Sequence, residues 1–377
     1  MSDTVTHPQA PRFLSLDVFR GLSVFLMILV NTPGAGAQPY AQLVHTRWLG
    51  FTLADLVFPS FLFAVGNALS FAAAGRDGHR DFFIKVIRRS LLIFLLGFLM
   101  YWFPFFHVQP DGSWAWNPLA DTRVMGVLQR IGLCYAIAAI AVRYLAVRWI
   151  VLFGAALLLG YWALLYLGSP PGLALDKLGN IGTRFDLWAL GREHLYRKDG
   201  GFDPEGLLGT LPATVNVLAG YLAGRYVRTS GNSWRTTSYL ALAGIAALSI
   251  ALLWNPWFPI AKKLWTSSFV LYTVGLDLLV LAALMQAIEV MGYRRGAAFF
   301  TVLGKNPLVI YLLSECLATA LHMIPLGSAN VLDWIGIRIF QRLAPGALGS
   351  LLAAVAYTMV CWLVGYVMDR RRIYVRL

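Results

Sequence analysis

His45 is the residue in this 377-residue sequence whose type and surroundings best suit catalysis. It lies ten residues before Asp55, and Asn31 precedes it in the same part of the chain. An imidazole titrates near neutral pH, so a histidine oriented by an amide or a carboxylate suits a general base or an acyl acceptor. Asp55 also has a purely structural interpretation, because an acid in the first turn of a helix, with Thr52 as its N-cap, suits the helix dipole. The local sequence leaves both interpretations open.

The chain that must position these residues is too apolar for a water-soluble protein. Hydrophobic residues make up 58% of it and charged residues 13%, whereas soluble domains average about 45–50% and about 25%. This composition excludes intrinsic disorder, a disulfide-rich secreted scaffold and an ordinary cytosolic enzyme. The net charge of +13 is spread over short basic runs between apolar stretches, which indicates membrane topology rather than nucleic-acid binding. We therefore expect a lipid bilayer as partner and no nucleic acid.

Ten stretches predict transmembrane helices, each of which needs about 20 apolar residues. Six of them carry no acidic or basic residue apart from histidine: 21–46, 56–75, 91–110, 149–175, 236–261 and 343–368. Four more are interrupted by isolated charges: 124–142, 207–226, 267–289 and 299–318. The three cysteines lie in apolar stretches, so we expect them to pack there and assign them no metal or disulfide chemistry. The sequence predicts an all-α integral membrane protein, a polytopic bundle of about ten transmembrane helices.

The distribution of basic residues predicts the orientation of this bundle. An even number of spans puts both termini on one side. The tails and even-numbered loops hold 17 basic residues, more than the odd-numbered loops. By the positive-inside rule both termini are cytoplasmic and His45 is outside. We expect one integral domain over residues 1–377, with a cytoplasmic tail over 1–13 and a long external loop over 168–206.

Charged residues inside these stretches, or directly before the first of them, predict a polar cavity within the bundle. Each costs at least about 2.5–3.5 kcal/mol on insertion scales and normally faces a protein interior or a water-filled space. The residues concerned are Asp17, Arg20, Arg130, Asp277, Lys305 and Glu315.

Five blocks of the sequence resemble the transmembrane domain of heparan-alpha-glucosaminide N-acetyltransferases. They are SLDVFRGL at 15–22, HTRWLGFTLADLVFP at 45–59, VLQRIG at 127–132, FDPEGLLGT at 202–210 and GKNPLVIY at 304–311. The blocks follow the family's order across most of the chain, so the resemblance is specific.

The resemblance implies a transmembrane acyltransferase domain that moves acetyl from cytoplasmic acetyl-CoA to the amino group of a glucosamine-type sugar on the other side. The family's active histidine falls on His45 and its active-site asparagine on Asn31, and Asp55 is the third catalytic candidate. The interval between Asn31 and His45 differs from the lysosomal members, with Pro33 and Pro39 in place of an aromatic-rich stretch. That departure bears on the identity of the acceptor more than on the chemistry.

Acetyl-CoA is the expected cosubstrate, and no metal is expected. Its phosphates need cations on the cytoplasmic side, although a basic cluster there also satisfies the positive-inside rule alone. The candidates for this role are Arg20, Lys85, Arg88, Arg89 and Arg130. For the acceptor we expect contacts from Trp48, Asp203 and Glu205, with an interfacial aromatic belt as the other interpretation of Trp48.

Two other functions fit the same polar cavity, namely an amino-sugar transporter and an O-acyltransferase that acts on a sugar hydroxyl. No paired halves with broken helices at matching positions are visible in the sequence, which favours the enzyme over the transporter. The expected partners are acetyl-CoA, an amino-sugar acceptor and the bilayer, and a homodimer is compatible with the sequence. The expected location is the bacterial inner membrane, with the external loop 168–206 in the periplasm.

Overall fold

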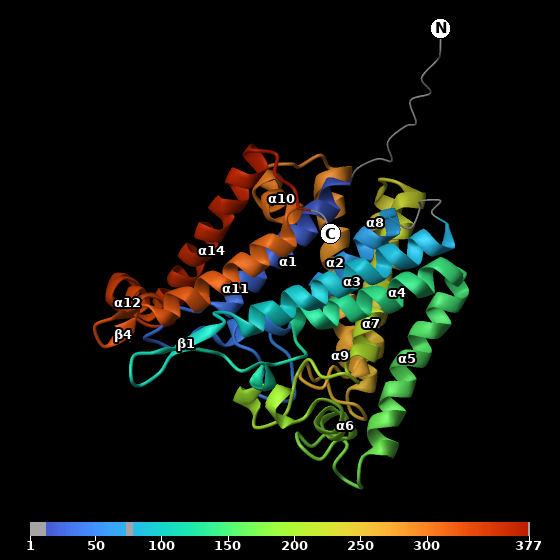
Figure 1. The fold of residues 1–377 in the computed structure, drawn as a ribbon. Helices are drawn as coiled ribbons and strands as arrows, with labels where there is room; N and C mark the ends of the chain where they lie inside the picture. Colours follow the sequence, from blue (N-terminus) through green and yellow to red (C-terminus); the bar gives the residue numbers. More distant parts are fainter. Residues whose placement is uncertain (1–12, 73–77, 376–377) are drawn as a thin grey trace.

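Long helices account for almost all the regular structure of this chain (Figure 1). The computed structural model describes residues 13–72 and 78–375, so of the predicted tail over 1–13 only Phe13 is included. The helices are α1 (Leu14–Asn31), α2 (Leu53–Ala72), α3 (His79–Trp102), α4 (Val127–Tyr144), α5 (Val147–Gly168), α6 (Ile181–Leu190), α7 (Thr210–Ser230), α8 (Trp234–Trp254), α9 (Ser267–Met285), α10 (Ala297–Lys305), α11 (Pro307–Met323), α12 (Val331–Ile335), α13 (Gln341–Leu343) and α14 (Ala347–Arg370). Two short hairpins pair β1 (Phe106–Val108) with β2 (Trp114–Trp116) and β3 (Pro325–Leu326) with β4 (Ala329–Asn330), both antiparallel.

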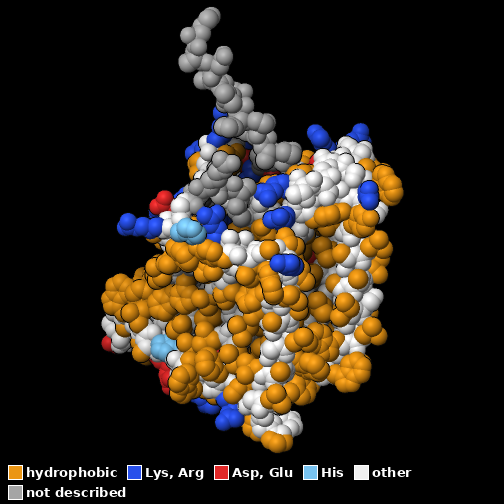
Figure 2. All heavy atoms as spheres, turned by 90° about the vertical axis from the view of Figure 1, so that its right-hand side faces the viewer, with side chains coloured by type: hydrophobic (Ala, Val, Ile, Leu, Met, Phe, Trp, Pro, Cys, Tyr) orange, Lys and Arg blue, Asp and Glu red, His pale blue; other side chains and the backbone are white. Residues whose placement is uncertain are grey.

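The predicted all-α membrane fold is confirmed. In the described residues, seven helices are long and apolar enough to cross a membrane, or eight if the bent pair α10 and α11 counts as one span. Each of the ten predicted stretches overlaps a long helix or this pair. The two that fall short of the apolar criterion are α3, whose first half is rich in charge, and α7, which is mostly buried inside the bundle. A broad apolar band covers the face seen in Figure 2, with basic side chains gathered at its two ends.

Helix ends differ from the charge-free stretches where the chain bends or becomes basic. The stretch 21–46 is free of acidic, lysine and arginine residues, but α1 ends at Asn31, because Pro33 and the glycines that follow do not continue a helix. In contrast, α3 begins at His79, well before the apolar stretch 91–110, because basic side chains are tolerated in a helix that extends beyond the hydrocarbon.

Close backbone contact holds α2 against α7 at the centre of the bundle. A Cβ atom on Gly66 of α2 would lie 1.9 Å from the carbonyl oxygen of Val217, and one on Gly220 of α7 would lie 2.0 Å from that of Phe63. Small residues allow this approach, which is the usual way helices associate in lipid. The contact fixes α2, the helix that carries Asp55.

The break between α10 and α11 brings both described chain ends together. These two helices meet at 81°. The Arg20 guanidinium of α1 donates to the Gly304 carbonyl oxygen at 2.6 Å, and Asn306 at the break exchanges hydrogen bonds with Ile373 and Val375 near the C-terminus. The start of α1 and the C-terminal segment therefore lie at the same end of the bundle.

The predicted long loop over 168–206 is ordered and lies at the other end. It contains α6, which Figure 1 shows at the bottom of the view, far from α10 at the top. Asn180 caps this helix by accepting from the backbone N–H of Thr183, and Asp186 within it accepts from that of Leu207. These bonds tie the loop to the segment that leads into α7.

Candidate active site

His45 and Asp55 meet between the ends of α1 and α2. The His45 Nδ1, in the loop before α2, lies 3.0 Å from the Oδ1 of Asp55 in the first turn of α2, ten positions further along the chain. The Asp55 Oδ2 accepts from the backbone N–H groups of Thr46 and Thr52. The two interpretations of Asp55 are thus compatible, because one oxygen serves the start of α2 and the other orients the imidazole.

The protonation of His45 follows from these contacts. Asp55 is fully buried, and its carboxylate oxygen only accepts, so the Nδ1 of His45 carries a hydrogen and the Nε2 of the neutral ring has the lone pair. Burial lowers the pKa of His45 from its ordinary value, and the Lys262 ammonium lowers it further, while the hydrogen bond to Asp55 opposes both. With 41% of its side chain still exposed, His45 is accessible to a reactant.

Lys262 completes this cluster from the segment between α8 and α9. Its Nζ lies 3.0 Å from the Nδ1 and 3.2 Å from the Nε2 of His45, and 3.7 Å from the Asp55 Oδ1. Burial lowers the pKa of Lys262, whereas the charges of Asp55 and Glu205 raise it. Sequence reasoning missed this lysine, because it is 217 residues from His45 and no local spacing connects them.

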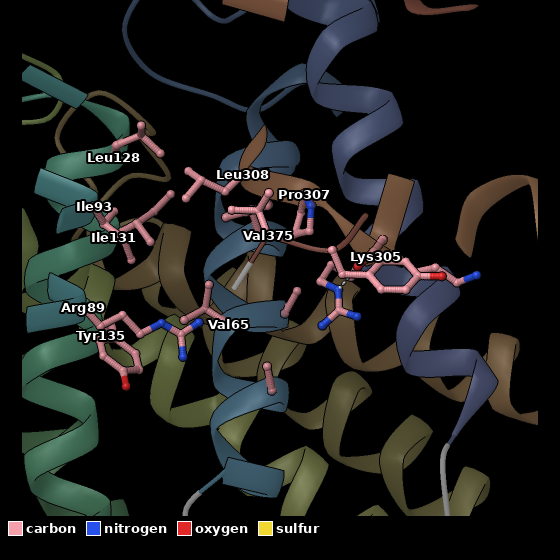
Figure 3. A pocket seen from close by; sticks show the side chains of 16 residues that line it. Val65, Arg89, Ile93, Leu128, Ile131, Tyr135, Lys305, Pro307, Leu308 and Val375 are labelled. Atoms are coloured by element: carbon pink, nitrogen blue, oxygen red, sulfur yellow. Dashed lines mark hydrogen bonds between the residues drawn. The ribbon is translucent and has the colours of Figure 1, made fainter. Parts of the chain in front are cut away.

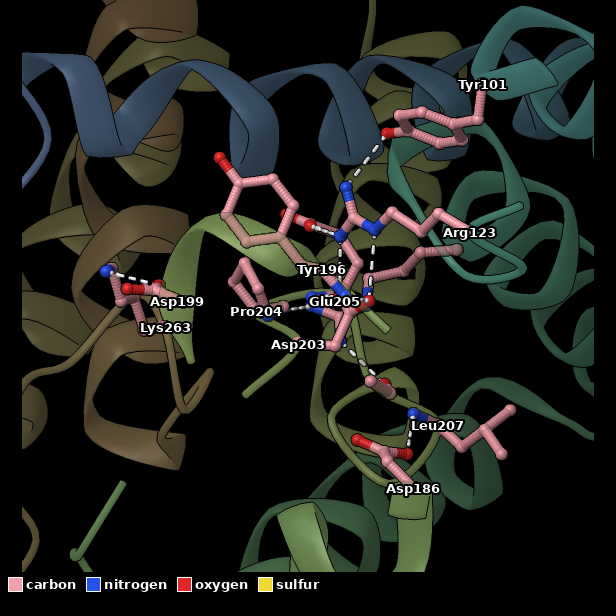
Figure 4. A network of polar contacts seen from close by, with 12 residues as sticks. Tyr101, Arg123, Asp186, Tyr196, Asp199, Asp203, Pro204, Glu205, Leu207 and Lys263 are labelled. Carbon is pink, nitrogen blue, oxygen red and sulfur yellow. Dashed lines mark hydrogen bonds and ion pairs between the residues drawn. The ribbon is translucent and has the colours of Figure 1, made fainter. Parts of the chain in front are cut away.

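A second cluster of charges centres on Arg123, as Figure 4 shows. Its guanidinium binds Asp203 through two nitrogens, at 3.0 and 2.5 Å, and Glu205 at 2.5 Å. The ring of Tyr196 lies under the same guanidinium, 4.6 Å away. Burial alone would raise the pKa of Glu205, but the Arg123 charge holds it below its ordinary value. Arg123 was also missed, since its partners lie about 80 residues downstream.

His45, Asn31 and Glu205 line one cavity of about 490 Å³, together with Lys262 and Arg123. Asn31 donates one amide hydrogen to the Glu315 Oε1 at 3.1 Å and has a second on the same nitrogen. The structure thus brings the three predicted catalytic residues together, with Asp55 directly behind His45. A base, a carboxylate that orients it and amide donors are the parts needed for acyl transfer.

The other two residues predicted to contact the acceptor do not line this cavity. The Trp48 indole donates to the Leu175 carbonyl oxygen at 3.0 Å and packs edge-on against Phe202, 5.0 Å away. Asp203 is buried behind Glu205, with both its oxygens on Arg123. These contacts support the wall of the cavity from outside.

A second cavity of about 480 Å³ lies at the end of the bundle where the described chain ends meet. Arg20, Arg89 and Lys305 supply its cations, and Tyr135 and Tyr374 its rings. In Figure 3, Arg89 and Tyr135 lie on one wall and Lys305 on the other. Part of this charge is neutralised, because Asp17 pairs with Arg20 and Asp369 with Lys305. Such a basic, partly apolar cavity suits a phosphate-bearing group with a flexible tail.

Only two of the five cations predicted for acetyl-CoA, Arg20 and Arg89, line this second cavity. Lys85 and Arg88 are exposed on α3 and do not line it. Arg130 is 1% exposed and donates to the carbonyl oxygens of Pro204 and Gly206 at 3.0 and 2.7 Å. Its charge therefore holds the segment that carries Glu205.

The two cavities share their walls. Phe58 and Phe61, one turn apart on α2, line the first and the second cavity respectively. On α4 the adjacent residues Val127 and Leu128 line the first and the second cavity respectively, and on α11 Tyr311 and Leu308 do so. Arg20 lies in the second turn of α1 and Asn31 is its last residue, so the two are about 16 Å apart along the helix axis. The cavities thus lie end to end through the bundle.

The described residues contain no group of three or more His, Cys, Asp or Glu side chains placed so that they could hold a metal ion.

Comparison with known proteins agrees with the resemblance in the sequence. Residues 12–256 match the family described as heparan-alpha-glucosaminide N-acetyltransferase, catalytic. The chain is 27% identical to heparan-alpha-glucosaminide N-acetyltransferase of Homo sapiens over 360 residues, which cover 80% of this chain and 52% of that protein. The Mus musculus protein of the same name is 26% identical over 367 residues, which cover 82% and 54%. The chain thus spans about half the length of these curated relatives, and it belongs to the heparan-alpha-glucosaminide N-acetyltransferase catalytic family.

Proposed function

We propose that this chain is a transmembrane acetyltransferase. It takes acetyl from acetyl-CoA in the cavity of Arg20, Arg89 and Lys305 and delivers it to the amino group of a glucosamine-type sugar in the cavity of His45. The observation that carries this proposal is the end-to-end arrangement of the two cavities between the same helices. Acetyl-CoA is too large and too charged to cross lipid, so only its thiol arm has to reach through the bundle.

The cation-lined cavity fits the nucleotide end of acetyl-CoA. Arginine guanidinium groups and a lysine ammonium bind phosphate oxygens through charge-assisted hydrogen bonds. The buried Nε of Arg89 has no hydrogen-bond partner among the described residues. The apolar side chains that line the rest of the cavity suit the thiol arm, which lies along α2 and α4 in this proposal.

His45 serves as the base in the other cavity. The amine nitrogen attacks the thioester carbonyl carbon, its proton passes to the His45 Nε2, the carbon–sulfur bond breaks, and the proton goes on to the leaving sulfur. The free amide hydrogen of Asn31 stabilises the negative charge on the carbonyl oxygen during this step. If His45 itself accepts the acetyl group first, the same residues serve both half-reactions, and an acetylated His45 accumulates when no sugar is present.

The acceptor is an amine rather than a hydroxyl in this proposal, because an imidazole of lowered pKa is a weak base. A neutral amine attacks without prior deprotonation and needs a base only as the bond forms, whereas a sugar hydroxyl needs stronger activation. The relatives' names refer to the glucosaminide of heparan. For this chain we propose a free amino sugar or a cell-wall fragment, met on the periplasmic side of a bacterial inner membrane with both termini cytoplasmic.

Replacement of His45 by alanine tests this function. We expect His45→Ala to lose acetyl transfer by at least about 10²–10⁴-fold, the usual cost of a lost general base, and to retain acetyl-CoA binding at the other end of the bundle. His107→Ala is the matched control, since His107 lies on the β1–β2 hairpin outside both cavities and bonds only to Asn117 among the described residues. Wild-type rates in a folded His45→Ala protein would refute the role of His45, and a folded, unaltered chain that moves glucosamine without acetylating it would favour an amino-sugar transporter.

A further inference from the structure

The local structure holds Lys262 rigidly against His45. The Ala261 N–H donates to the Thr266 hydroxyl, and the Thr266 N–H donates back to the Ala261 carbonyl oxygen. The Gly50 N–H, from the same loop as His45, donates to the Ile260 carbonyl oxygen at 2.8 Å. Three backbone groups next to Lys262 are thus fixed, and one of them is tied directly to the histidine loop.

The neighbouring lysine shows that this placement is specific. The Lys263 Nζ points to the Asp199 Oδ2 at 2.5 Å, and Lys177 binds the other oxygen of the same carboxylate at 2.6 Å. Lys262 instead lies within 3.2 Å of both ring nitrogens of His45, with a side chain only 13% exposed. Two adjacent lysines therefore have different surroundings, and only one of them contacts the imidazole.

Most of the other charges around His45 are engaged in ion pairs with one another. Arg123 binds Asp203 and Glu205, and Lys263 binds Asp199. The remaining titratable groups that line the cavity are Arg47, which belongs to the histidine loop, and the phenols of Tyr101, Tyr196 and Tyr311. The Asp55 carboxylate and the Lys262 ammonium are the opposite charges that directly face the ring.

Since Asp55 accepts from Nδ1, protonation of the ring has to occur at Nε2. The Lys262 Nζ lies 3.0 Å from Nδ1 and 3.2 Å from Nε2, so it is beside the ring and about equally far from both nitrogens. A protonated ring would place a second positive charge next to this ammonium, and like charges disfavour the protonated form of a histidine. An ammonium has no lone pair and cannot accept a hydrogen from the ring, so Lys262 acts on His45 as a charge.

We propose that Lys262 is a positioning residue that acts through His45: its ammonium keeps the imidazole neutral, while Asp55 keeps the hydrogen on Nδ1 and so leaves the lone pair on Nε2. This inference rests on the proposed function, in which His45 Nε2 is the reacting atom. It extends that function by assigning to Lys262 the protonation state of the imidazole. The ring stays neutral at acidic pH values at which a histidine of ordinary pKa would be protonated.

The test measures the protonation of His45 without the reaction. Diethyl pyrocarbonate modifies only neutral imidazole, so its rate at the His45 peptide, followed by mass spectrometry over pH 4.5–8.5, gives the midpoint of protonation. We expect a midpoint below 6.5 in the unaltered chain and a rise of about one to three pH units in Lys262→Met. Lys262→Arg, which keeps the charge, restores a low midpoint. Lys263→Met, which removes a charge from the same segment, shifts the midpoint by much less than Lys262→Met.

An unchanged midpoint in a folded Lys262→Met protein overturns the inference. If that variant does not fold, the unaltered chain decides, because a midpoint of 6.5 or above in it also overturns the inference. The acetyl-transfer rate is measured in parallel, at a pH where the acceptor amine is neutral. If the His45 midpoint rises in Lys262→Met but the unaltered chain transfers no acetyl group, the proposed function is refuted and the role of Lys262 stands. If acetyl transfer requires His45 but the midpoint does not change in Lys262→Met, only the role of Lys262 is refuted.

Discussion

Replacement of Asp55 by asparagine exchanges one carboxylate oxygen for an NH₂ group, and the hydrogen bonds of Asp55 determine how this change affects His45. The Asp55 Oδ2 accepts from two backbone N–H groups, those of Thr46 at 3.3 Å and Thr52 at 3.1 Å, and from the Thr52 hydroxyl at 3.1 Å. An asparagine keeps its carbonyl oxygen at these donors, because backbone N–H groups cannot accept. Its NH₂ group then faces the His45 Nδ1.

This exchange imposes the wrong tautomer on the imidazole. An NH₂ group donates, so the His45 Nδ1 becomes the acceptor and the hydrogen moves to Nε2, the atom that has to accept the amine proton. In a serine-protease triad, the same aspartate-to-asparagine change lowers kcat by about 10⁴-fold for this reason. We expect Asp55→Asn to lower the kcat of acetyl transfer by about 10³–10⁴-fold. Higher pH does not restore the rate, because the defect is a tautomer and not a charge.

The assay is kcat for acetyl transfer to glucosamine with both substrates saturating, in detergent or nanodiscs. Asp55→Asn also leaves the Lys262 ammonium without its counter-ion. Because breaking a buried ion pair lowers the stability of a protein by about 3–5 kcal/mol, thermal unfolding of the variant is measured first. Thr52→Val is the control, since it removes one hydroxyl contact to Asp55 and keeps the carboxylate; a loss of about tenfold or less is expected. A kcat within tenfold of wild type in folded Asp55→Asn would show that Asp55 does not set the tautomer of a catalytic histidine.

Three further predictions concern the surroundings of the site. Arg89→Gln weakens acetyl-CoA binding by about tenfold or more in calorimetry, because it removes a charge-assisted contact from the basic cavity. Arg88→Gln, on the exposed side of α3, leaves this binding unchanged. Equal effects of the two changes would make both residues topology signals only. Glu205→Gln raises the KM for glucosamine by about 10–100-fold, which corresponds to the free energy of a lost hydrogen bond to a charged group, and leaves the KM for acetyl-CoA nearly unchanged. The reverse pattern would show that the acceptor does not bind in the cavity of His45. Burial raises the pKa of Asp186 to about 7, so the free energy of unfolding falls as pH rises from about 4 to 7. Asp186→Asn keeps the hydrogen bond from the Leu207 N–H and removes the buried charge. It therefore stabilises the protein by up to about 4 kcal/mol at pH 8 and little at pH 4, measured by thermal unfolding at the two pH values. A stabilisation that does not depend on pH contradicts the raised pKa of Asp186.

Local composition predicted the long helices but not where they end. Lipid requires about 20 apolar residues for each span, and this requirement is visible in the sequence of each helix by itself. The end of α1 at Asn31 depends on Pro33 and the following glycines, and the early start of α3 at His79 depends on where the hydrocarbon ends. A count of charged residues contains neither piece of information. For the same reason the number of spans stays a prediction for α3 and α7.

The site was predictable only where its residues are close in sequence. His45 and Asp55 are ten residues apart, and the family resemblance pointed to both His45 and Asn31. Lys262 and Arg123 reach the site through tertiary packing from distant segments, so nothing near them in sequence signals a role. Arg130 illustrates the opposite error of a local argument, because a charge inside a span indicates a polar partner but does not say whether that partner is a substrate or, as here, two backbone carbonyls.

Acetyl transfer across a sealed membrane tests the central claim most directly. The purified chain is placed in proteoliposomes that enclose glucosamine, and acetyl-CoA labelled in its acetyl group is supplied outside. We predict that labelled N-acetylglucosamine accumulates inside, that the CoA released stays outside, and that His45→Ala vesicles form no labelled sugar. The account is contradicted if no labelled sugar forms inside vesicles whose protein is folded and binds acetyl-CoA, or if unmodified glucosamine crosses the membrane in place of the acetyl group.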